Sequence, residues 1–588
     1  MKKQEFTAQD SLFRKIAGSL FCLLMFIMPL KFGTVAVMPE VSSFYPDHAA
    51  DYIFVSWPSA AFGVFSGTVL LLVLAAFRPK IKLNGLTLCA ILFGIAPIPV
   101  ALWGKLISPN SFYSNSVICH ISGICAAVIS SAILVMNGKV WRDRILYSLG
   151  AGTCLLTIGA FRQYFAGFEE MQEFARMQEQ NGIVLSDAVR LKLTDGRVYA
   201  AMSSANLLAG FMLLAAPLLV SCSAILSRKF EPQKLSLKIF CTVAAILGAG
   251  SLLMTKTRGA FLAAAITAVI WLFSSKKIKK SVKLLLCGAV AATMLLGALY
   301  IHTKGRGFGS MGERVGYLNT SLIMLCEKPL AGHGWGEFFY RHMELKKTGS
   351  NESAHNPHNV IADFAVHTGA AAGILALFAF LYPLFKLWKR REELDALEYA
   401  VLWGGTAAFF HSLTDINTQC PAVISALLIA LLVCQENSEE EREAAKVWHI
   451  LFAAAAAAIA VTSATANWIY LRADAALNHL EECCSPPVRE KFYLSTPGNV
   501  RRAADRVQQL RPEHPFALSS AGSYFMALRD YETAEKYFND SLKLDPRRPG
   551  VLRKLADIAE IKGDTAKAEE LRLKAHKLFP SNPEYKLK

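Results

Sequence analysis

Long apolar segments alternate with short polar connections along the first 470 residues of the chain. A helix needs about 20 mostly apolar residues to cross a bilayer, and runs of about 18 or more recur here. The pattern predicts about thirteen membrane helices, at 16–36, 55–77, 83–103, 117–136, 145–165, 200–226, 237–254, 259–274, 282–301, 359–388, 398–413, 421–435 and 448–470. The expected fold class is therefore all-α, a polytopic helical membrane protein. No A-x-A-like cleavage site follows the long first segment, so we interpret it as a membrane helix and not as a signal peptide.

The pattern changes after about residue 472, where the chain is charged and helical in period. Pro512, Pro546 and Pro580 are each 34 residues apart, which is the period of a tetratricopeptide repeat of two helices. Small and aromatic residues occupy the positions expected for it: Gly522, Phe525, Ala534, Phe538, Ala556, Ala568 and Ala575. Two units and a preceding half are few for a free solenoid, so we expect them to dock on the membrane domain or to dimerise. The predicted domains are 1–470 in the membrane and 471–588 outside it.

The net charge of +16 is concentrated in every second connection. Cytoplasmic connections of membrane proteins are enriched in Lys and Arg, so this alternation places the N-terminus in the cytoplasm and accounts for most of the charge without nucleic acid. The acidic segment 436–446 disagrees with its predicted cytoplasmic position, but acidic residues contribute little to orientation. The basic groups are Lys2, Lys3, Arg14 and Lys15; Arg78, Lys80 and Lys82; Lys139, Arg142 and Arg144; Arg228, Lys229 and Lys234; Lys276, Lys277, Lys279, Lys280 and Lys283; and Lys386, Lys389, Arg390 and Arg391.

The 13 cysteines lie mostly within apolar segments, and none forms a C-x-x-C pair. We interpret them as small buried hydrophobic residues. The adjacent Cys483 and Cys484 lie outside the spans and receive no role.

With an odd number of spans, the outer connections are 37–54, 104–116, 166–199, 255–258, 302–358, 414–420 and everything after 470. The two longest loops are 166–199 and 302–358, and long structured loops on one side of a bundle are where sites are built. An amphipathic helix is expected in the first of them, around Phe168 to Met177.

Candidate residues collect on this outer side. Lys256 and Arg258 lie in a tight turn between two spans, where an Arg either snorkels to the interface or meets an anion. Arg197 and Asn206 lie at the outer mouth of the span 200–226, and Asn206 either joins helices by hydrogen bonds or belongs to a site. His411 and Asp415 lie at the outer end of a later span.

The polar stretch from Arg314 to Gly373 separates two apolar segments and carries the richest chemistry. Its HNPHN sequence places His355 and His358 just ahead of a span; these imidazoles are either solvated in a turn or part of a site. Metal binding is disfavoured because the outer loops offer no Cys partners and no H-E-x-x-H motif. The GHGWG turn is either a phosphate-binding glycine loop or a simple bend of the chain. It lacks the preceding strand of phosphate-binding glycine loops, which favours the bend.

Two arginines and a histidine at a membrane surface suit one chemistry in particular. Guanidinium groups bind phosphate oxygens bidentately at any working pH, so Arg258 and Arg314 can hold a pyrophosphate whose lipid tail lies between helices. Fixed cations also stabilise the charge on a leaving pyrophosphate. His358 can accept the proton of an incoming hydroxyl. The reaction implied is glycosyl transfer from a lipid-linked sugar.

Five segments in order carry a family resemblance: RVYAAMSSANLLAG, TKTRGAFLA, ERVGYLNTSLIMLCEKPLAGHGWGEF, HNPHNVIADFAVHTG and HSLTDINTQCP, over roughly 197–435. The chain resembles the O-antigen ligase and polymerase superfamily, which includes bacterial protein O-oligosaccharyltransferases. The resemblance implies a glycosyltransferase of the bacterial inner membrane that needs no metal or cofactor, with its site on the periplasmic face. It also implies a polyprenyl (undecaprenyl) pyrophosphate glycan as donor.

The resemblance further implies pyrophosphate binding by Arg258 and Arg314 and acceptor activation by His358. The surrounding substrate-binding candidates are Arg197, Asn206, Lys256, His355, Asn359 and Asp415. The chain departs from the ligase pattern at Gly369 and Gly373, which stand where a GxxG is usual, and at His367, which replaces an acidic residue. These departures concern the subgroup more than the catalysis.

The acceptor stays open between lipid A-core, protein hydroxyls and a growing polysaccharide. The helical repeats favour a ligase slightly, because a concave helical surface can present an acceptor or recruit a protein partner. The alternative from a different functional class is a non-catalytic membrane scaffold or transporter. Transporters often carry charged residues near the membrane midplane, whereas the charged residues of this chain are predicted at one interface.

Overall fold

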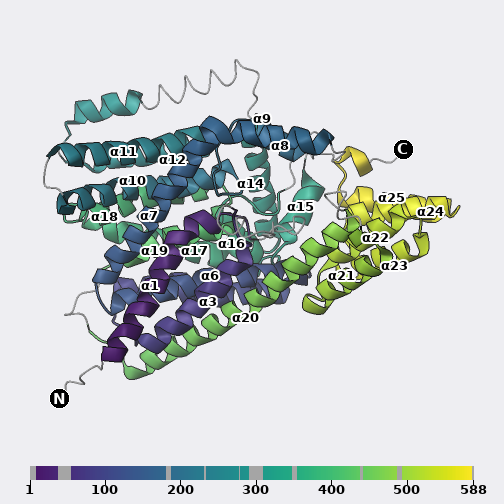
Figure 1. The fold of residues 1–588 in the computed structure, drawn as a ribbon, viewed down its shortest axis with the longest axis horizontal. Helices are drawn as coiled ribbons and strands as arrows, with labels where there is room; N and C mark the ends of the chain where they lie inside the picture. The colour runs from purple at the N-terminus through teal and green to yellow at the C-terminus, as the bar shows by residue number, and fades with distance from the viewer. Residues whose placement is uncertain are drawn as a thin grey trace.

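The computed structural model describes residues 8–36, 55–180, 187–230, 234–276, 278–289, 309–346, 354–436, 442–485 and 493–585. Across these ranges the regular elements are helices, as predicted, with only two isolated β-bridges (Figure 1). Eight helical segments are long and apolar enough to cross a membrane: Leu12–Lys31, Ser59–Ala76, Gly85–Ile107, Ser111–Met136, Val140–Gln180, Ala205–Arg228, Ala370–Lys389 and Lys446–Cys484. Three shorter apolar helices are Lys238–Met254, Arg258–Ser274 and Pro421–Val433.

The helices of the membrane bundle are α1 (Ala8–Lys31), α3 (Ser59–Ala76), α4 (Gly85–Ala90), η1 (Ile91–Ile95), α5 (Pro97–Ile107), α6 (Ser111–Met136), α7 (Val140–Arg162), α10 (Ala205–Phe230), α11 (Lys234–Met254), α12 (Arg258–Ser274), α17 (Ala370–Lys389), α18 (Ala396–Ser412), α19 (Pro421–Val433) and α20 (Lys446–Cys484). The shorter connecting helices are η2 (Gln163–Gly167), α8 (Phe168–Gln180), α9 (Asp187–Thr194), α14 (Gly309–Glu327), α15 (Glu337–Leu345), α16 (Val360–Thr368) and η3 (Asn417–Gln419). The C-terminal helices are α21 (Pro497–Leu510), α22 (Pro515–Ala527), α23 (Tyr531–Leu544), α24 (Pro549–Ile561), α25 (Thr565–Leu578) and η5 (Pro583–Tyr585).

The thirteen predicted spans are not all shown, because only eight helical segments within the described ranges are long and apolar enough to cross a membrane. The helices differ from the predicted spans in three further respects. The segment 359–388 is not one helix but two, α16 and α17, separated by Gly369. The last span does not end near 470, because α20 continues without a break to Cys484. The predicted span 282–301 falls largely outside the described residues. The amphipathic helix expected near Phe168 is present as α8.

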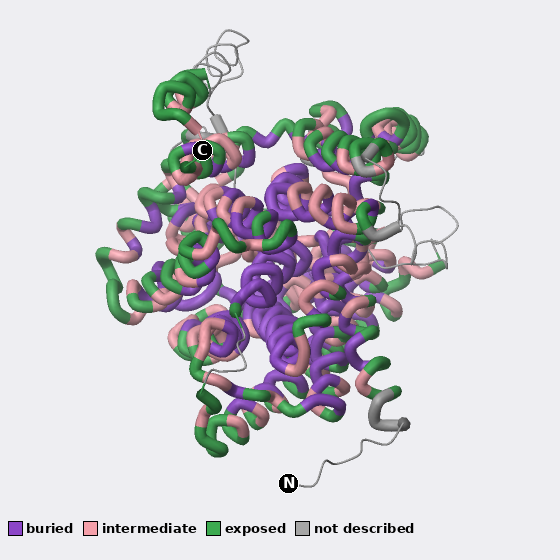
Figure 2. The backbone as a smooth tube through the Cα atoms, turned by 90° about the vertical axis from the view of Figure 1, so that its left-hand side faces the viewer, coloured by how far each residue is buried: buried purple, intermediate pink, exposed green. Residues whose placement is uncertain are grey.

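The core of the bundle surrounds α6 and α19. Every residue of α19 is buried, and 83% of the apolar window of α6 is buried. Figure 2 shows the same distribution, with buried positions gathered in the middle of the bundle and exposed positions on the outer helices. A helix that is apolar on all sides suits either lipid or a protein core, and here neighbouring helices cover α19 on every face.

The described ends of the acidic segment, Glu436 and residues 442–446, lie against basic connections. Lys82 and Glu443 form an antiparallel bridge, and Ala444 N–H donates to the carbonyl of Ile81 at 2.9 Å. Arg390 contacts Glu436 at 3.6 Å. These connections therefore share one end of the bundle, as the predicted topology requires.

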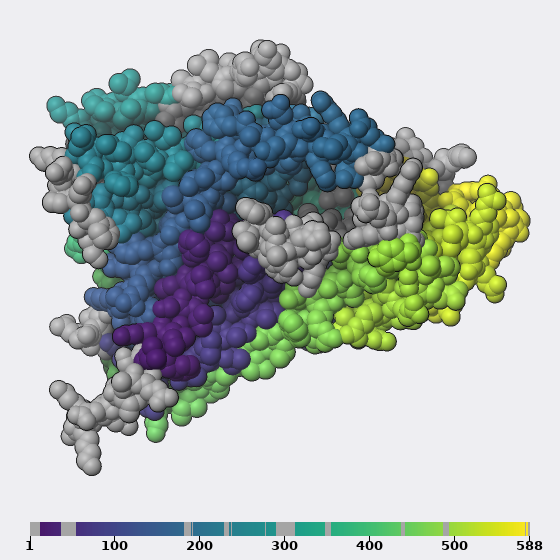
Figure 3. Space-filling view, viewed as in Figure 1, coloured from purple at the N-terminus to yellow at the C-terminus, as the bar shows by residue number. Residues whose placement is uncertain are grey.

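The C-terminal helices form a regular array of pairs. Helix α24 begins 34 residues after α22, and α25 begins 34 residues after α23. Gly522 allows close packing, since a Cβ there would lie 2.7 Å from the ring of Phe538. The pairs agree with the predicted period, and their assignment as tetratricopeptide repeats stays a prediction. In Figure 3 they form the green to yellow lobe that extends from one end of the molecule.

This lobe docks on the membrane bundle, as expected for so few repeats. Arg511 donates to the carbonyl of Phe112 at 3.3 Å and lies over the Phe112 ring, with its guanidinium carbon 4.3 Å from the centroid. Arg547 makes two hydrogen bonds to the Glu337 carboxylate, at 2.6 and 2.7 Å. The lobe therefore lies at the same end of the bundle as α14 and α15 (Figure 1).

Replacing Gly369 by Ala is expected to destabilise the protein by about 2 kcal/mol or more. Gly369 has φ of +96°, and a Cβ there would lie 2.0 Å from the carbonyl oxygen of Leu330. Thermal unfolding of the purified protein in detergent measures the loss. The matched control is Gly159→Ala in α7, where a Cβ meets no atom within 4 Å. Equal stability of the two variants would contradict the strain argument.

Candidate functional site

The carboxylate of Asp415 organises a polar cluster at the end of α18. Asp415 is 4% exposed, and its Oδ2 accepts hydrogen bonds from Arg314 Nη2 at 3.1 Å and Asn206 Nδ2 at 2.7 Å. Arg314 also donates from Nε to the carbonyl of Thr414 at 2.7 Å. Because a buried carboxylate is stable only when paired and hydrogen-bonded, these contacts fix α10 and α14 around one turn.

Arg197 extends the cluster toward α12. Its Nη2 donates to Asn206 Oδ1 at 2.6 Å and to Thr257 Oγ1 at 3.1 Å, and its Nε donates to the carbonyl of Thr255 at 3.0 Å. Burial lowers the pKa of Arg197, while Asp195 and Asp415 raise it and Arg314 and Arg258 lower it. The Arg197 side chain thus links the turn ahead of α12 to Asp415.

His358 lies beside the cluster in a strained conformation. Its φ is +53°, and its N–H donates to Asn356 Oδ1 at 3.1 Å. The imidazole stacks on Tyr317 with 5.0 Å between ring centroids, one helical turn after Arg314 on α14. A left-handed backbone is uncommon outside Gly, although His adopts it more often than most residues, and such strain concentrates at functional sites.

Asn359 fixes the segment that carries His358. Its Oδ1 caps α16 by accepting from the N–H groups of Ile361 and Ala362, both at 3.0 Å. Its Nδ2 donates to the carbonyl of Leu413 at 2.9 Å, two residues before Asp415. The turn 413–415 is therefore held by both Asn359 and Arg314.

Arg258 differs from the other two arginines because its side chain is exposed at the first position of α12. Within the described ranges no carboxylate pairs with it. The adjacent Gly259 packs against the same turn, since a Cβ there would lie 3.1 Å from Thr414 Oγ1. A cation at the positive end of a helix dipole is unfavourable unless an anion joins it.

Residues 243–390 match the sequence profile of a family described as O-Antigen ligase. This stretch is an O-antigen ligase domain. Membership of the family implies a membrane glycosyltransferase-like enzyme of the ligase or polymerase kind, acting on lipid-linked glycans. A comparison with curated proteins finds no match.

The ligase domain contains Arg258, Arg314, His355, His358 and Asn359. The other partners, Arg197, Asn206 and Asp415, come from outside the matched residues. The polar cluster therefore joins side chains of the domain to side chains on both sides of it in the sequence.

Two predicted residues of the site lie apart from the cluster. Lys256 is exposed, with φ of +51°, and its Nζ approaches Gly196 and not the carboxylate of Asp415. His355 stacks between Phe339, with ring centroids 4.4 Å apart, and Tyr113, at 6.2 Å. It lines a different cavity, which faces the C-terminal helices.

Sequence reasoning missed Tyr317 and Thr257. Tyr317 is 1% exposed and supports the His358 ring, and Thr257 binds Arg197. The spacing of three residues between Arg314 and Tyr317 on one helix face was a signal that could have indicated the first. No sequence pattern near Thr257 indicates its role.

The GHGWG turn packs the ligase domain against α5 and α6. Gly334 has φ of +90°, and a Cβ there would lie 2.4 Å from Cα of Ser108. The carbonyl of Trp335 accepts a hydrogen bond from Ser108 Oγ at 2.7 Å. The indole Nε1 of Trp335 donates to the carbonyl of Ala101 at 3.0 Å. These contacts agree with a structural bend. His367 belongs to the same packing, with its ring 5.0 Å from that of Trp335.

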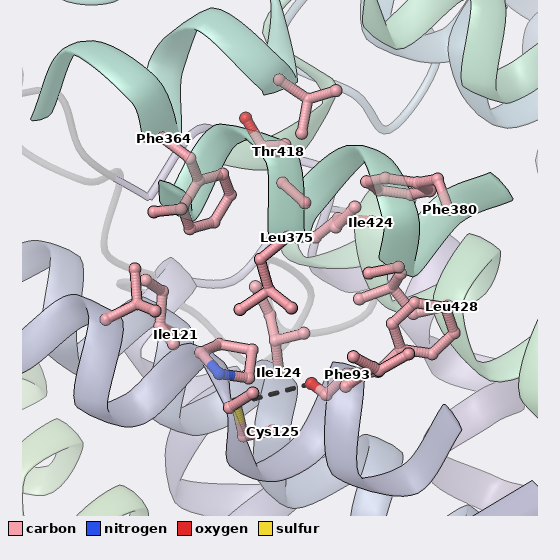
Figure 4. Close-up of a pocket in the computed structure, with 18 residues that line it drawn as sticks. Phe93, Ile121, Ile124, Cys125, Phe364, Leu375, Phe380, Thr418, Ile424 and Leu428 are labelled. Carbon is pink, nitrogen blue, oxygen red and sulfur yellow. Dashed lines mark hydrogen bonds between the residues drawn. The ribbon is translucent and has the colours of Figure 1, made fainter. Parts of the chain in front are cut away.

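An apolar cavity of about 100 Å³ opens between α5, α6, α17 and α19. Figure 4 shows its lining, with Phe93 and Ile124 on one side and Leu375 and Phe380 on another. Val360, two residues after His358, also lines it. The described residues contain no group of three or more His, Cys, Asp or Glu side chains that could hold a metal ion.

Acid is expected to destabilise the ligase domain through two neutral histidines. Burial lowers the pKa of His355 to about 4, and burial with Lys346 and His358 lowers that of His342 to about 4. The folded state then binds fewer protons than the unfolded state between pH 6.5 and 4. The stability that the two neutral imidazoles contribute is fully present above pH 6.5. It is lost as the pH decreases toward 4, by about 3 kcal/mol per histidine.

The effect is measured as unfolding free energy against pH. His355→Phe preserves the aromatic stack and is expected to reduce the slope below pH 6.5, whereas His479→Phe, at an exposed side chain, leaves it unchanged. An unaltered slope in the His355 variant would contradict the desolvation argument.

Proposed function

We propose that this protein transfers a glycan from a polyprenyl pyrophosphate donor to an acceptor hydroxyl, as an O-antigen ligase-like enzyme. The observation that carries the proposal is the gathering of Arg314 and the segment of His358 around Asp415 and its turn, with Arg197 joined to Asp415 through Asn206. The exposed Arg258 flanks the same turn. These are the groups that a pyrophosphate-leaving reaction needs.

The arginines bind and stabilise the pyrophosphate. Arg258 and the N-terminus of α12 together offer a positive site for an anion. Arg314 is held in place by Asp415 and Thr414, so its position costs no reorganisation when charge develops on the leaving group.

His358 is the base. The acceptor oxygen attacks the anomeric carbon, and the bond from this carbon to the pyrophosphate oxygen breaks. The hydroxyl proton passes to the imidazole of His358, and the lipid pyrophosphate leaves with the bonding electron pair. Asn359 and Tyr317 fix the segment and the ring from which His358 acts.

The apolar cavity receives part of the polyprenyl chain. Its lining from α5, α6, α17 and α19 is apolar, and it begins at Val360, close in sequence to His358. A prenyl segment buried there replaces contact with lipid by packing between helices. This places the headgroup near the arginines and the tail in the bundle.

The orientation follows from charge. The basic connections at the opposite end face the cytoplasm, so the site and the C-terminal lobe face the periplasm of a bacterial inner membrane. The docked lobe favours a ligase over a polymerase, since it adds a surface beside the site for an acceptor.

The test is glycan transfer with a defined undecaprenyl-pyrophosphate oligosaccharide. Lipid A-core, protein and polymer products are each sought, with wild type, Arg258→Ala and Arg258→Lys. We expect one product class from wild type and about 100-fold less from Arg258→Ala. Lysine keeps the charge and is expected to recover part of the activity. Transfer by Arg258→Ala at the wild-type rate would refute the assignment, and no product from wild type would favour a scaffold or transporter.

Filling the apolar cavity is expected to weaken donor binding selectively. Ala376→Trp places an indole in the cavity, so KM for the lipid donor should rise about tenfold while kcat changes little. The control is Ala371→Trp, on the same helix at an exposed position outside the lining. Equal KM values for both variants would exclude this cavity as the tail site.

A further inference from the structure

His411 is a buried histidine at the end of α18 to which the proposed reaction assigns no role. It is 0% exposed, and its Nδ1 lies 3.0 Å from Nδ2 of Asn417. Its Nε2 is also buried and makes no hydrogen bond to any described residue. Buried polar atoms are nearly always hydrogen-bonded, so a ring nitrogen without a partner at this position is a candidate contact for a ligand.

The hydrogen bonds around Asn417 determine which ring nitrogen of His411 carries the proton. The hydroxyl of Ser412 donates to the carbonyl of Ala408 at 2.8 Å, so its oxygen accepts from Asn417 Nδ2, at 3.0 Å. This contact fixes the orientation of the Asn417 amide, whose second N–H bond points at His411 Nδ1. A ring nitrogen that accepts a hydrogen bond carries no proton, and the other nitrogen of the neutral ring is then a donor. His411 therefore presents a buried Nε2–H group.

The Nε2 edge of His411 faces the first turn of α12. A Cβ on Gly259, the second residue of this helix, would lie 3.8 Å from Nε2 and 3.7 Å from Cδ2 of His411, and 3.1 Å from Thr414 Oγ1. Glycine leaves this face of the helix end without a side chain of its own. Gly259 and Thr414 are half-buried, and the preceding Arg258 is exposed. The donor of His411 is therefore directed toward a part of the helix that reaches the surface.

The first turn of α12 adds backbone donors of its own. The first N–H groups of an α-helix have no partner within the helix, and a Thr at the N-cap position usually binds one of them. Thr257 is the N-cap residue here, but its hydroxyl accepts from Arg197 at 3.1 Å and makes no capping hydrogen bond. The 17 residues of α12 also place partial positive charge at this end. Anions bind at such helix ends through the backbone N–H groups.

The charges around this helix end also favour an anion. Arg197 interacts there with two carboxylates and two further guanidinium groups, those of Asp195, Asp415, Arg258 and Arg314. Within this group the positive charges outnumber the negative ones. An anion that joins the group reduces the repulsion among the arginines.

We propose that His411 and Gly259, with the first N–H groups of α12, form a binding site for one phosphate of the leaving pyrophosphate. The proposal rests on the proposed function and adds a neutral donor to it. A phosphate oxygen at the first turn accepts from Nε2–H of His411, while Arg258 binds another oxygen. The hydrogen bond becomes stronger as negative charge develops on the leaving group, and the proton stays on Nε2 throughout.

Solid-state NMR of the full-length protein in liposomes tests the contact without requiring turnover. The protein carries ¹⁵N-labelled histidine, and the probes are farnesyl pyrophosphate and inorganic pyrophosphate. The signals of His411 are those missing from His411→Gln. We expect ³¹P of the bound probe to dephase the Nε2 signal of His411. Binding of farnesyl pyrophosphate without this dephasing would overturn the proposal.

The two probes separate a lipid-linked ligand from free pyrophosphate. Dephasing by farnesyl pyrophosphate alone assigns the site to the lipid-linked donor. Dephasing by both probes shows that the pyrophosphate group is sufficient for binding. Dephasing by inorganic pyrophosphate alone would overturn the assignment to the leaving group of the donor.

Two independent substitutions test the donor and the bare helix end. His411→Phe keeps a flat ring but removes the N–H, so the Kd for farnesyl pyrophosphate should rise about tenfold or more. Gly259→Ala leaves His411 unchanged but places a methyl group beside Nε2, and a similar rise is expected with an unfolding temperature near that of wild type. The control is Gly159→Ala in α7, where a Cβ meets no atom within 4 Å and wild-type binding is expected. Wild-type affinity in either His411→Phe or Gly259→Ala would overturn the site.

Arg258→Ala distinguishes failure of this inference from failure of the proposed function. If Arg258→Ala loses binding while His411→Phe and Gly259→Ala bind as wild type does, His411 has no part in the site and the proposed function stands. If wild type binds neither probe, both the phosphate site and the proposed pyrophosphate donor are contradicted.

Discussion

His358→Asn is expected to lower kcat for glycan transfer by about 10³-fold, within the 10² to 10⁴ range of general-base catalysis. Asn tolerates the left-handed backbone found at this position, where φ is +53°, so the loop retains its conformation. Its amide cannot accept a proton at neutral pH, and the loss therefore falls on the chemical step. The measurement is transfer rate at saturating donor and acceptor.

Three further measurements make this result specific. His358→Ala should lose as much activity as His358→Asn, and both should insert in the membrane with little change in unfolding temperature. His479→Asn, at an exposed histidine of α20, should keep wild-type activity. Transfer by His358→Asn within about tenfold of wild type would show that the acceptor proton goes elsewhere.

Asp415→Ala is expected to destabilise the protein by about 3 to 5 kcal/mol and to abolish transfer. Asp415 is the shared acceptor of Arg314 and Asn206, and its side chain is 3% exposed. Removing it leaves Arg314 and Asn206 without their shared acceptor, and Arg197, which bonds Asn206, loses a nearby negative charge. Chemical unfolding in mixed micelles gives the stability, and the transfer assay gives the activity.

The matched control for this loss is a surface ion pair. Asp540 pairs with Lys543 at 2.7 Å on the exposed face of α23, so Asp540→Ala should cost less than about 1 kcal/mol. Asp415→Asn, which keeps the shape and one acceptor oxygen, should fall between the two in stability. If Asp415→Ala proved as stable as wild type and as active, Asp415 would not organise the site.

Much of the fold could be predicted because it depends on local patterns. Apolar segments long enough for a bilayer indicated the membrane helices, and a period of 34 residues indicated the paired C-terminal helices that the structure contains. Gly369 shows the limit. The sequence around it is mostly apolar despite Asp363, His367 and Thr368, so hydropathy predicts one span. The break arises because the chain at Gly369 passes against Leu330.

The candidate site, too, could be predicted from the sequence only in part. The arginines, His358 and Asp415 could be selected from their residue types and their predicted side of the membrane. Which of these side chains contact one another could not be predicted, because Asp415 bonds Arg314 across 101 residues of sequence and Asn206 across 209. His355 and His358 look equivalent in HNPHN, yet His355 lines the cavity that faces the C-terminal helices and His358 stacks on Tyr317.

The sequence by itself determined a helical membrane protein, the sorting of basic connections to one end, and the set of charged residues available for chemistry. These follow from hydropathy and charge, which act on each segment separately. Only the tertiary structure decided that α20 continues into the lobe, that Asp415 joins three distant elements, and that a cavity forms between the membrane bundle and the C-terminal helices. Such features depend on which distant surfaces pack together, and packing is a property of the whole chain.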